Sequence, residues 1–588
     1  MKKLFLFFTL LLVITHSLKA QPTTTDNKEL SDLLTDFFDE GIKLSPVNAT
    51  SIGDNRYNDK LPAEFTDSYR KWMKDFYNGY LVALGKFKRD DLNDNDKLNY
   101  DIFKWRLQTS LEGLSFSDNR IPFTQFGGAP LTIAQFGSGT VVQPFKTVKD
   151  YDNWISRAKA FTIWADSAIL YFRKGITEKI VLPKSLVVKM IPQMEGFVTT
   201  DPEKSVFYGP VKNMPADFSE ADKKRLTNAY INLIKEQIVP AYQKLASFLK
   251  NEYLPQSRSS SGIGSLPGGE AWYNFNLRQT ATVNKTADEL FNTGLEEVKR
   301  IRTEMEKVKT EVGFTGDLNA FFDFMKTDPQ FYPYKTQEEI VKAYQAIGEK
   351  ITPNLQRLFL HAPKTAFEIR PTEAFRAATS AAQYNAGLAD GSRPGIFYVP
   401  IVDPSKVPVR ESLFIHEAIP GHHYQIMLQR ENEKLPSFRR YSSFTAYAEG
   451  WGLYCESLGK ELGLYTDPYQ YMRALGDEIH RAIRLVVDPG IHAKGWSREE
   501  AIKYMMENEP ISEPAATAEI ERYMAIPGQA IAYKVGALKL QQLRAKYSKQ
   551  LGKSFNIARF HDEVLKDGAM PLNILEKKMD KWVKKGGK

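Results

Sequence analysis

Cysteine is almost absent from this 588-residue sequence, which contains only Cys455. A single thiol cannot form an internal disulfide, so the fold must be stabilised by its core. Cys455 lies in an apolar helical stretch, where a free cysteine usually packs as a small apolar side chain. It is also far from the N-terminus, which excludes it as the lipid-modified residue of a lipoprotein.

Long apolar runs are missing beyond the first 20 residues. There, Lys2 and Lys3 precede an apolar run that ends at Ile14, and Ala20 is followed by a polar, Thr-rich stretch. The run has roughly half of the ~20 residues needed to cross a bilayer. We therefore predict a signal peptide over residues 1–20, export to the periplasm, and no stable membrane anchor after cleavage.

A strong charge of one sign is missing too. The sequence has 79 Lys and Arg against 71 Asp and Glu, a formal charge of +8. Cleavage after Ala20 removes the three lysines at positions 2, 3 and 19, which lowers the charge to +5. This small excess predicts no nucleic-acid binding. With 42% hydrophobic and 26% charged residues, the composition is that of a globular protein.

The apolar pattern indicates a mainly α fold. Apolar residues recur at three- and four-residue spacing from Leu30 to Leu111, and again from Arg440 to the C-terminus. Thr286 and Glu289 form the pattern of a capping box, which predicts that a helix begins there.

Two Gly- and Ser-rich segments interrupt the helical pattern. Residues 116–143 read as an extended loop, and residues 257–269 as a connection between two halves. The second segment is the better candidate boundary. It divides the mature chain into an N-terminal helical half, residues 21–256, and a catalytic helical half, residues 257–588.

One short strand is expected at Gly395–Ile401. Pro400 is tolerated only at the end of a strand or on a sheet edge, because proline has no N–H to donate. We therefore predict an edge strand that can pair with an extended peptide. Tyr398, within this strand, is a candidate substrate-binding residue.

The chemistry is concentrated just after that strand. Of the eight histidines, His416, His422 and His423 fall within eight residues, and Glu417 follows the first. Zinc peptidases usually carry His-Glu-x-x-His, in which two imidazoles four residues apart share one metal and the Glu faces the bound water. Here Pro420 occupies the position of the second histidine.

This departure leaves the second ligand open. A separation of six residues is about 600° on a regular helix, which places His416 and His422 on different faces, whereas His423 would return to the first face. Pro420 makes a regular helix unlikely to continue, because it removes a backbone donor and clashes with the preceding turn. A bulge at residues 419–421 would bring His422 into register, and we favour it over His423.

The segment from His416 to Gln425 resembles the hallmark of the bacterial family named domain of unknown function 885, whose members are regarded as zinc-dependent peptidases of the gluzincin group. Further segments agree with this family and cover most of the mature chain. They are Leu266–Gly269 followed by Tyr273, Asp390–Gly395, Glu449–Trp451, Asp488–His492, Arg522–Tyr523, Pro527–Gln529 and Tyr533–Lys534.

The resemblance implies a large helical body split by a deep substrate channel, with a small β-sheet next to the zinc-binding helix. It is similar in this to angiotensin-converting enzyme, thimet oligopeptidase and the thermostable carboxypeptidases. It also implies a third ligand, a Glu on a later helix. Glu449 fits, and Glu456 is the alternative, because residues seven apart share one helical face.

His416, His422 and Glu449 would leave Zn²⁺ with a net positive charge and an open position for water. Glu417 is then the general base that takes the proton of the attacking water. Zinc is the expected metal, although Co²⁺ or Mn²⁺ can bind the same ligands.

Other residues are candidates for stabilising the oxyanion or holding the substrate. For the oxyanion we favour Tyr523, which lies in a segment similar to one that carries a catalytic tyrosine in the helical peptidases, ahead of Tyr533 and His492. The candidates for holding substrate are Arg393, Arg522 and Lys534, which suit a carboxylate, together with Tyr398 and Tyr273.

The sequence therefore predicts a secreted zinc metallopeptidase that hydrolyses short or unstructured peptides, with carboxypeptidase action as one option. Two alternatives remain. One is a zinc hydrolase of another amide or ester, including cell-wall peptides, and the other is a non-catalytic helical protein that binds peptides. The oligomeric state stays open.

Overall fold

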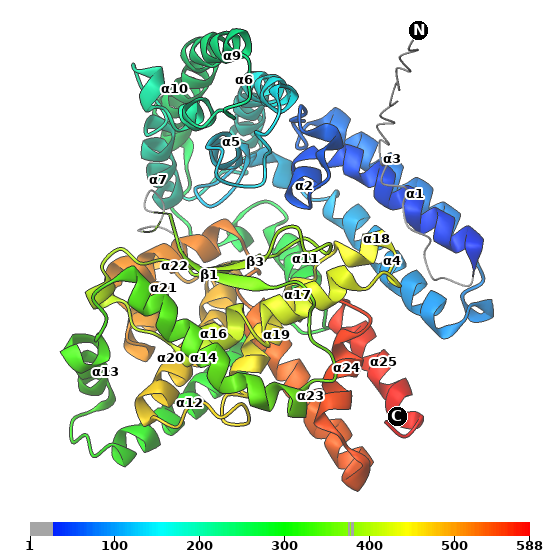
Figure 1. Ribbon diagram of the computed structural model, residues 1–588, viewed down its shortest axis with the longest axis vertical. Helices are drawn as coiled ribbons and strands as arrows, with labels where there is room; N and C mark the ends of the chain where they lie inside the picture. Colours follow the sequence, from blue (N-terminus) through cyan, green and yellow to red (C-terminus); the bar gives the residue numbers. More distant parts are fainter. Residues whose placement is uncertain (1–26, 374–376, 378–380, 588) are drawn as a thin grey trace, which may run out of the picture.

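The computed structural model describes residues 27–373, 377 and 381–587, so the predicted signal peptide lies outside the described residues. Helices joined by short connections make up most of the chain, together with one three-stranded sheet (Figure 1). This confirms the predicted mainly α class. None of the helices in the described residues combines the length and the apolar composition of a membrane-spanning segment.

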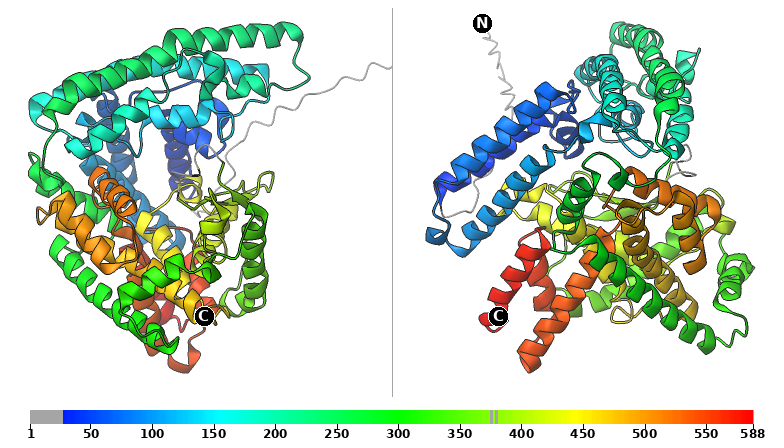
Figure 2. Two further views of the ribbon diagram at one scale, coloured as in Figure 1. Left: turned by 90° about the vertical axis from the view of Figure 1, so that its left-hand side faces the viewer. Right: turned by 180° about the vertical axis from the view of Figure 1, so that it is seen from behind.

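The N-terminal half is entirely helical in its regular elements. Its α-helices are α1 (Lys28–Leu44), α2 (Pro46–Ser51), α3 (Asp67–Leu84), α4 (Asp94–Gly113), α5 (Ala129–Gly137), α6 (Val148–Glu178), α7 (Lys184–Glu195), α8 (Gly209–Lys212), α9 (Glu220–Leu233) and α10 (Val239–Phe248). The helices between residues 148 and 248, cyan to green in Figure 2, form a layer over the body that carries the C-terminal half.

The second half carries the remaining elements. Its α-helices are α11 (Gly269–Ala281), α12 (Ala287–Glu311), α13 (Leu318–Thr327), α14 (Gln337–Leu358), α16 (Glu411–Glu417), α17 (His422–Glu431), α18 (Ser437–Arg440), α19 (Thr445–Glu456), α20 (Pro468–His492), α21 (Arg498–Asn508), α22 (Glu513–Ala525), α23 (Ala532–Leu551), α24 (Ile557–Leu565) and α25 (Leu572–Lys584). The capping box before α12 is confirmed: the backbone N–H of Glu289 donates to Thr286 Oγ1 at 3.2 Å, and that of Thr286 donates to Glu289 Oε2 at 2.7 Å.

The prediction of an extended loop over residues 116–143 was wrong in part, because α5 lies inside it. The glycines and Pro130 suggested a loop, yet Pro130 occupies the first turn of the helix, where its missing N–H leaves no bond unmade. The apolar Ile133, Ala134 and Phe136 are buried and provide the packing that holds this helix in place.

The sheet consists of β1 (Phe367–Pro371), β2 (Gln383–Asn385) and β3 (Gly395–Val399), in the order β1-β3-β2. β3 pairs in parallel with β1 and antiparallel with β2. The strand itself was predicted, but its edge position was wrong, because neighbours on both sides occupy its backbone groups. Pro400 directly follows the strand, so it interrupts no ladder bond.

The main apolar core includes side chains from both sides of residue 256. Trp154 and Tyr230 from the first half belong to the same cluster as Val298 and Ile483 from the second. The segment after residue 256 is also pinned in place, since the backbone N–H of Ile263 donates to His492 Nδ1 at 3.0 Å. The two halves are thus packed through a shared core.

Candidate metal centre

The histidine cluster lies at a break between two helices. α16 ends at Glu417 and α17 begins at His422, with a non-helical turn from Ala418 to Gly421 between them. Trp451 Nε1 donates to the carbonyl oxygen of Pro420 at 2.9 Å and fixes this turn. A Cβ at Gly421 would overlap the carbonyl oxygens of Ile415 and His416, so only glycine fits. The break returns His422 to the side of His416.

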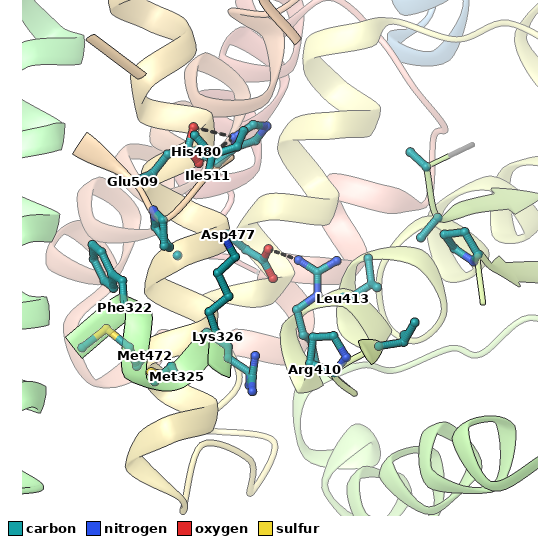
Figure 3. Close-up of a pocket in the computed structure, with 18 of the residues that line it drawn as sticks. Phe322, Met325, Lys326, Arg410, Leu413, Met472, Asp477, His480, Glu509 and Ile511 are labelled. Atoms are coloured by element: carbon teal, nitrogen blue, oxygen red, sulfur yellow. Dashed lines mark hydrogen bonds and ion pairs between the residues drawn. The ribbon is translucent and has the colours of Figure 1, made fainter. Parts of the chain in front are cut away.

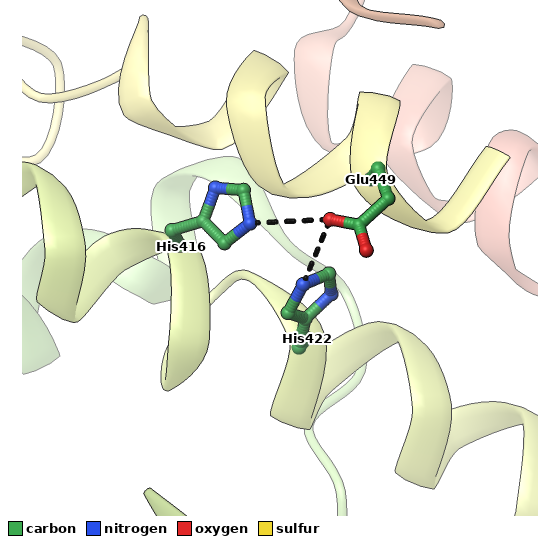
Figure 4. A group of neighbouring side chains, drawn as sticks. All are labelled: His416, His422 and Glu449. Atoms are coloured by element: carbon green, nitrogen blue, oxygen red, sulfur yellow. Dashed lines mark ion pairs between the residues drawn. The ribbon is translucent and has the colours of Figure 1, made fainter. Parts of the chain in front are cut away.

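Three side chains converge at this break (Figure 4). Glu449 Oε2, from α19, lies 3.5 Å from His416 Nε2 and 3.4 Å from His422 Nε2. One nitrogen or oxygen atom of each residue lies within 4.8 Å of the others. Throughout the part of the chain that the structure describes, this is the one group of His, Cys, Asp or Glu with a geometry that can hold a metal ion.

Glu456 lies behind the first histidine rather than in the group of three. Its Oε1 is 2.7 Å from His416 Nδ1. A carboxylate at that distance accepts the Nδ1–H, which leaves the lone pair on Nε2 to face Glu449 and His422. Such a partner behind a ligand is the usual way in which proteins orient a metal-binding imidazole.

His423 points away from the group. Its Nδ1 is 2.8 Å from the Tyr384 hydroxyl, and its ring packs against Phe367 with centroids 4.9 Å apart. Burial lowers the pKa of His423 to about 4, so the ring is neutral at physiological pH. Of the two candidates for the second ligand, the structure therefore brings His422 to His416 and Glu449.

The electrostatics of the site favour a cation. Burial raises the pKa of Glu449, but hydrogen bonds with His416 and His422 outweigh it and hold this pKa well below the ordinary value. Burial lowers the pKa of His416, but hydrogen bonds with Glu449 and Glu456 outweigh it and raise this pKa to about 10. The donor set of two imidazoles and a carboxylate is one that suits Zn²⁺. His422 Nδ1 is buried and has no partner among the described residues.

Glu417 lies next to the group at the end of α16 and is only 8% exposed. Burial raises the pKa of its carboxyl, and the two histidines partly offset this effect. Glu417 lines a cavity of about 600 Å³ formed by residues of α13, α16, α20 and α22. Figure 3 shows this cavity and the charged side chains on its wall.

Of the predicted oxyanion-stabilising residues, Tyr533 lies nearest the group. Its ring stacks 6.4 Å from that of His416, and no described residue is hydrogen-bonded to its hydroxyl. The Tyr523 hydroxyl has two partners of its own: it donates to Glu519 at 2.5 Å and accepts from Arg484 Nε at 2.8 Å. His492 Nε2 is 3.1 Å from the carbonyl oxygen of Tyr523, and burial lowers the pKa of His492 to about 3.

The family model for bacterial proteins of unknown function named DUF885 matches residues 46–579. The chain belongs to the DUF885 family. Its fold matches that of a candidate lipoprotein from Colwellia psychrerythraea, with 27% identity, a TM-score of 0.88, and coverage of 96% of this chain and 100% of the other. It also matches a candidate lipoprotein of unknown function from Shewanella oneidensis, with 19% identity, a TM-score of 0.72, and coverage of 94% and 99%.

A carboxypeptidase from Pyrococcus furiosus also aligns with this DUF885 chain. The TM-score is 0.40 at 9% identity, over 96% of this chain and 100% of the other, and this likeness is too distant to support an inference. No curated protein matches the chain.

The predicted substrate-binding residues of this DUF885 protein have varied surroundings. Lys534 Nζ is buried between Glu297 at 2.8 Å and Glu478 at 2.6 Å, as in a structural ion pair. Each of the other four has a contact within the protein. Arg522 pairs with Glu519 at 2.9 Å, Tyr273 donates to Asp488 at 2.6 Å, Arg393 donates to the carbonyl oxygen of Ala386 at 3.3 Å, and Tyr398 lies opposite Gln383 in the sheet.

The charged wall of the cavity is not among the features predicted from the sequence. Arg473, Asp477, Arg481 and Arg484 all lie on α20 and line the cavity beside Glu417. Their spacing places them on one helical face, which the sequence does show. Nothing in the sequence, however, says that this face of α20 meets α16.

Proposed function

We propose that this DUF885 protein is an exported zinc-dependent metallopeptidase that hydrolyses short or unstructured peptides. The observation that carries the proposal is the buried group of His416, His422 and Glu449 with Glu417 beside it. A hydrolase of this class needs metal ligands and a carboxylate that can move a proton, and a cavity next to both. Here the three ligands converge beside Glu417, and Glu417 lines a cavity that His416, His422 and Glu449 do not line.

His416 Nε2, His422 Nε2 and an oxygen of Glu449 would hold the ion. Glu456 supports this role, because its hydrogen bond to His416 Nδ1 fixes the tautomer that presents Nε2. When bound, Zn²⁺ supplies Lewis acidity, which lowers the pKa of a water to about 7 and offsets the charge of an oxyanion.

Glu417 would handle the protons. Its carboxylate accepts a proton from the water that attacks the peptide carbonyl carbon, and then donates that proton to the nitrogen of the leaving amine. The position of Glu417 on the cavity wall gives it access to a peptide, and its burial keeps bulk water from competing.

Tyr533 is the residue best placed to donate to the developing oxyanion. Its ring lies beside His416, and its hydroxyl has no hydrogen-bond partner among the described residues. One preorganised donor of this kind is typically worth about 3 kcal/mol in the transition state. The Tyr523 hydroxyl is already hydrogen-bonded to Glu519 and Arg484.

The test is the metal content of the purified mature chain, with hydrolysis of a mixed peptide library followed alongside. Wild type is compared with His422→Ala, Glu449→Gln and His423→Ala, the last being the matched control beside the site. We expect about one zinc per wild-type chain, loss of zinc in the first two variants, and retention in the third. Stoichiometric zinc without cleavage of any peptide would reject the peptidase assignment, and a folded wild type that takes up no metal would reject the site.

A further inference from the structure

One face of α20 forms a charged wall in the cavity beside Glu417. Arg473, Asp477, Arg481 and Arg484 follow one another at helical spacing and line this cavity. Figure 3 labels Asp477 beside Arg410. We call these residues, with Arg410 of the segment before α16, the arginine wall. It is separate from the group of His416, His422 and Glu449, none of which lines this cavity.

At one end of the arginine wall, two guanidinium groups share one carboxylate. Asp477 Oδ1 lies 2.5 Å from Arg410 Nη1 and 3.5 Å from Arg481 Nη1. Asp477 also accepts a hydrogen bond from the Ser412 hydroxyl at 2.6 Å. One negative charge is thus set against two positive charges.

The same imbalance occurs at the other end. Glu519 Oε2 lies 3.2 Å from Arg484 Nη2 and 2.9 Å from Arg522 Nη2. His480, between them, pairs with its own carboxylate, Glu509, at 2.8 Å. Glu456 Oε1 also lies 3.9 Å from Arg481 Nη2, so these four guanidinium groups face three carboxylates, which leaves an excess of one positive charge.

Two donors in the arginine wall have no partner. Arg484 Nη1 and Arg481 Nε are buried and are hydrogen-bonded to no described residue. Arg484 is only 6% exposed. A buried donor on a charged group that makes no hydrogen bond destabilises the folded protein. A carboxylate in the cavity would satisfy these donors, accepting one hydrogen bond from each guanidinium group, and would reduce the excess charge.

The arginine wall lies within a few residues' reach of the metal group. The guanidinium carbon of Arg484 lies 4.5 Å from the centre of the Tyr533 ring, which stacks 6.4 Å from the His416 ring. The two distances together bound the separation of Arg484 and His416 at about 11 Å. An extended peptide advances roughly 3.3–3.6 Å per residue, so this separation corresponds to about three residues.

We propose that the arginine wall, through Arg484 and Arg481, binds a carboxylate of the peptide substrate within about three residues of the bond that is cleaved. The inference rests on the proposed function and narrows it to peptides that carry a negative charge near that bond. Both a C-terminal α-carboxylate and an acidic side chain present this group. The first would make the protein an exopeptidase that trims C-termini, and the second a peptidase selective for acidic residues.

The experiment measures peptide binding to the zinc-loaded Glu417→Gln protein by calorimetry. Four matched peptides combine a free or amidated C-terminus with Glu or Gln near that end. Binding is repeated with Arg484→Gln and Arg481→Gln in the same background. Arg300→Gln serves as the matched control, since Arg300 pairs with Glu297 and Glu478 outside the cavity.

We expect affinity to fall about 10- to 100-fold when the recognised carboxylate is neutralised, as for a hydrogen bond to a charged group. Sensitivity to amidation identifies the α-carboxylate, and sensitivity to the Glu-to-Gln change identifies a side chain. In Arg484→Gln this preference should disappear, whereas it should persist in Arg300→Gln. Equal binding of all four peptides, or a preference that survives in Arg484→Gln, would overturn the inference.

Two further measurements keep the result interpretable. If Arg484→Gln fails to fold, as judged by thermal unfolding, the four-peptide comparison with Arg484 intact still decides whether a carboxylate is recognised. Arg484→Lys, which keeps the charge but removes Nη1, then replaces it. Cleavage by the wild-type protein is followed separately. Cleavage without carboxylate preference would overturn this inference alone, whereas carboxylate-selective binding without any cleavage would reject the peptidase proposal and retain the anion site.

Discussion

The metal group and the arginine wall are both at least partly buried, and both adjoin Glu417, but their charges are unbalanced in opposite directions. Around His416 and His422, the acids are Glu417, Glu449 and Glu456, so two imidazoles face three carboxyl groups. In the arginine wall, guanidinium groups outnumber carboxylates. Burying an unbalanced charge is costly, so each region indicates the ligand that would balance it: a cation in one and an anion in the other.

The largest expected effect breaks the chemistry without changing either charge-binding region. Glu417→Gln should lower peptide hydrolysis by about 100- to 10,000-fold, because a positioned proton-transfer group contributes that much. Zinc content should remain at the wild-type level, since Glu417 is not among the three converging ligands. Turnover by this variant within a few-fold of wild type would show that another group moves the proton.

The next prediction tests whether zinc binding depends on Glu456, the carboxylate bonded to His416 Nδ1. Glu456→Gln should weaken zinc affinity about 10- to 100-fold, as substitutions behind a metal ligand typically do. The expected cause is loss of the anionic acceptor at His416 Nδ1. Glu461→Gln is the control, because Glu461 pairs with Arg544 at the surface. Equal zinc affinity in both variants, measured by competition with a chelator, would remove Glu456 from the site.

A smaller loss of zinc affinity is expected when the His416 ring is displaced. A Cβ at Gly452 would lie 2.7 Å from Cε1 and 2.8 Å from Nε2 of His416. Gly452→Ala should therefore displace the imidazole and weaken zinc binding by about tenfold, since small misplacements in a preorganised site are costly. Gly79→Ala is the matched helical control, because no atom lies within 4 Å of its added Cβ. Identical zinc affinities would mean that the ring adapts freely.

His561 is a buried histidine whose ring nitrogens bond no carboxylate, so it can be compared with the histidines of the metal group. His561 Nδ1 is bonded to the carbonyl oxygen of Leu358 and Nε2 to the Tyr454 hydroxyl, both at 2.8 Å. Burial lowers the pKa of His561 from 6.5 to about 3. Between these two pKa values, the unfolded chain binds a proton at His561 and the folded chain does not. The folded protein therefore loses stability as the pH falls below 6.5.

This loss should amount to about 1.4 kcal/mol per pH unit between pH 4.5 and 5.5. Denaturant unfolding of wild type and His561→Phe across this range measures it. The variant should be less stable at neutral pH, because it loses two hydrogen bonds, but its stability should depend less steeply on pH by about one proton. Parallel curves for the two proteins would show that His561 is not kept neutral by the fold.

The sequence predicted local features well, because local chemistry sets them. Pro420 predicted an interrupted helix and a shifted second histidine, and the structure has that break, with His422 beside His416. The capping pattern at Thr286 was confirmed. What failed depended on partners distant in the sequence. β3 became a central strand because β1 and β2, which were not predicted as strands, pair on its two sides.

The same limit applies to the arginines. Lys534 was a candidate for binding substrate, but Glu297 of α12 and Glu478 of α20 enclose it. Arg484 was not among the predicted site residues. It differs from the others in that Nη1 has no partner, whereas Nε contacts Tyr523 and Nη2 contacts Glu519 and His480. Which donor of a guanidinium group stays unpaired depends on the packed structure, so residue spacing alone does not predict it.

The contact between α19 and α23 has a mechanical consequence. Gly450 and Gly536 lie backbone to backbone, and a Cβ on either would overlap the other helix. Glu449 and Tyr533 are close neighbours of these glycines along their helices, so the carboxylate and the tyrosine are borne on one rigid joint. In the proposed peptidase, we therefore expect any opening that admits a peptide to come from elements other than α19 and α23.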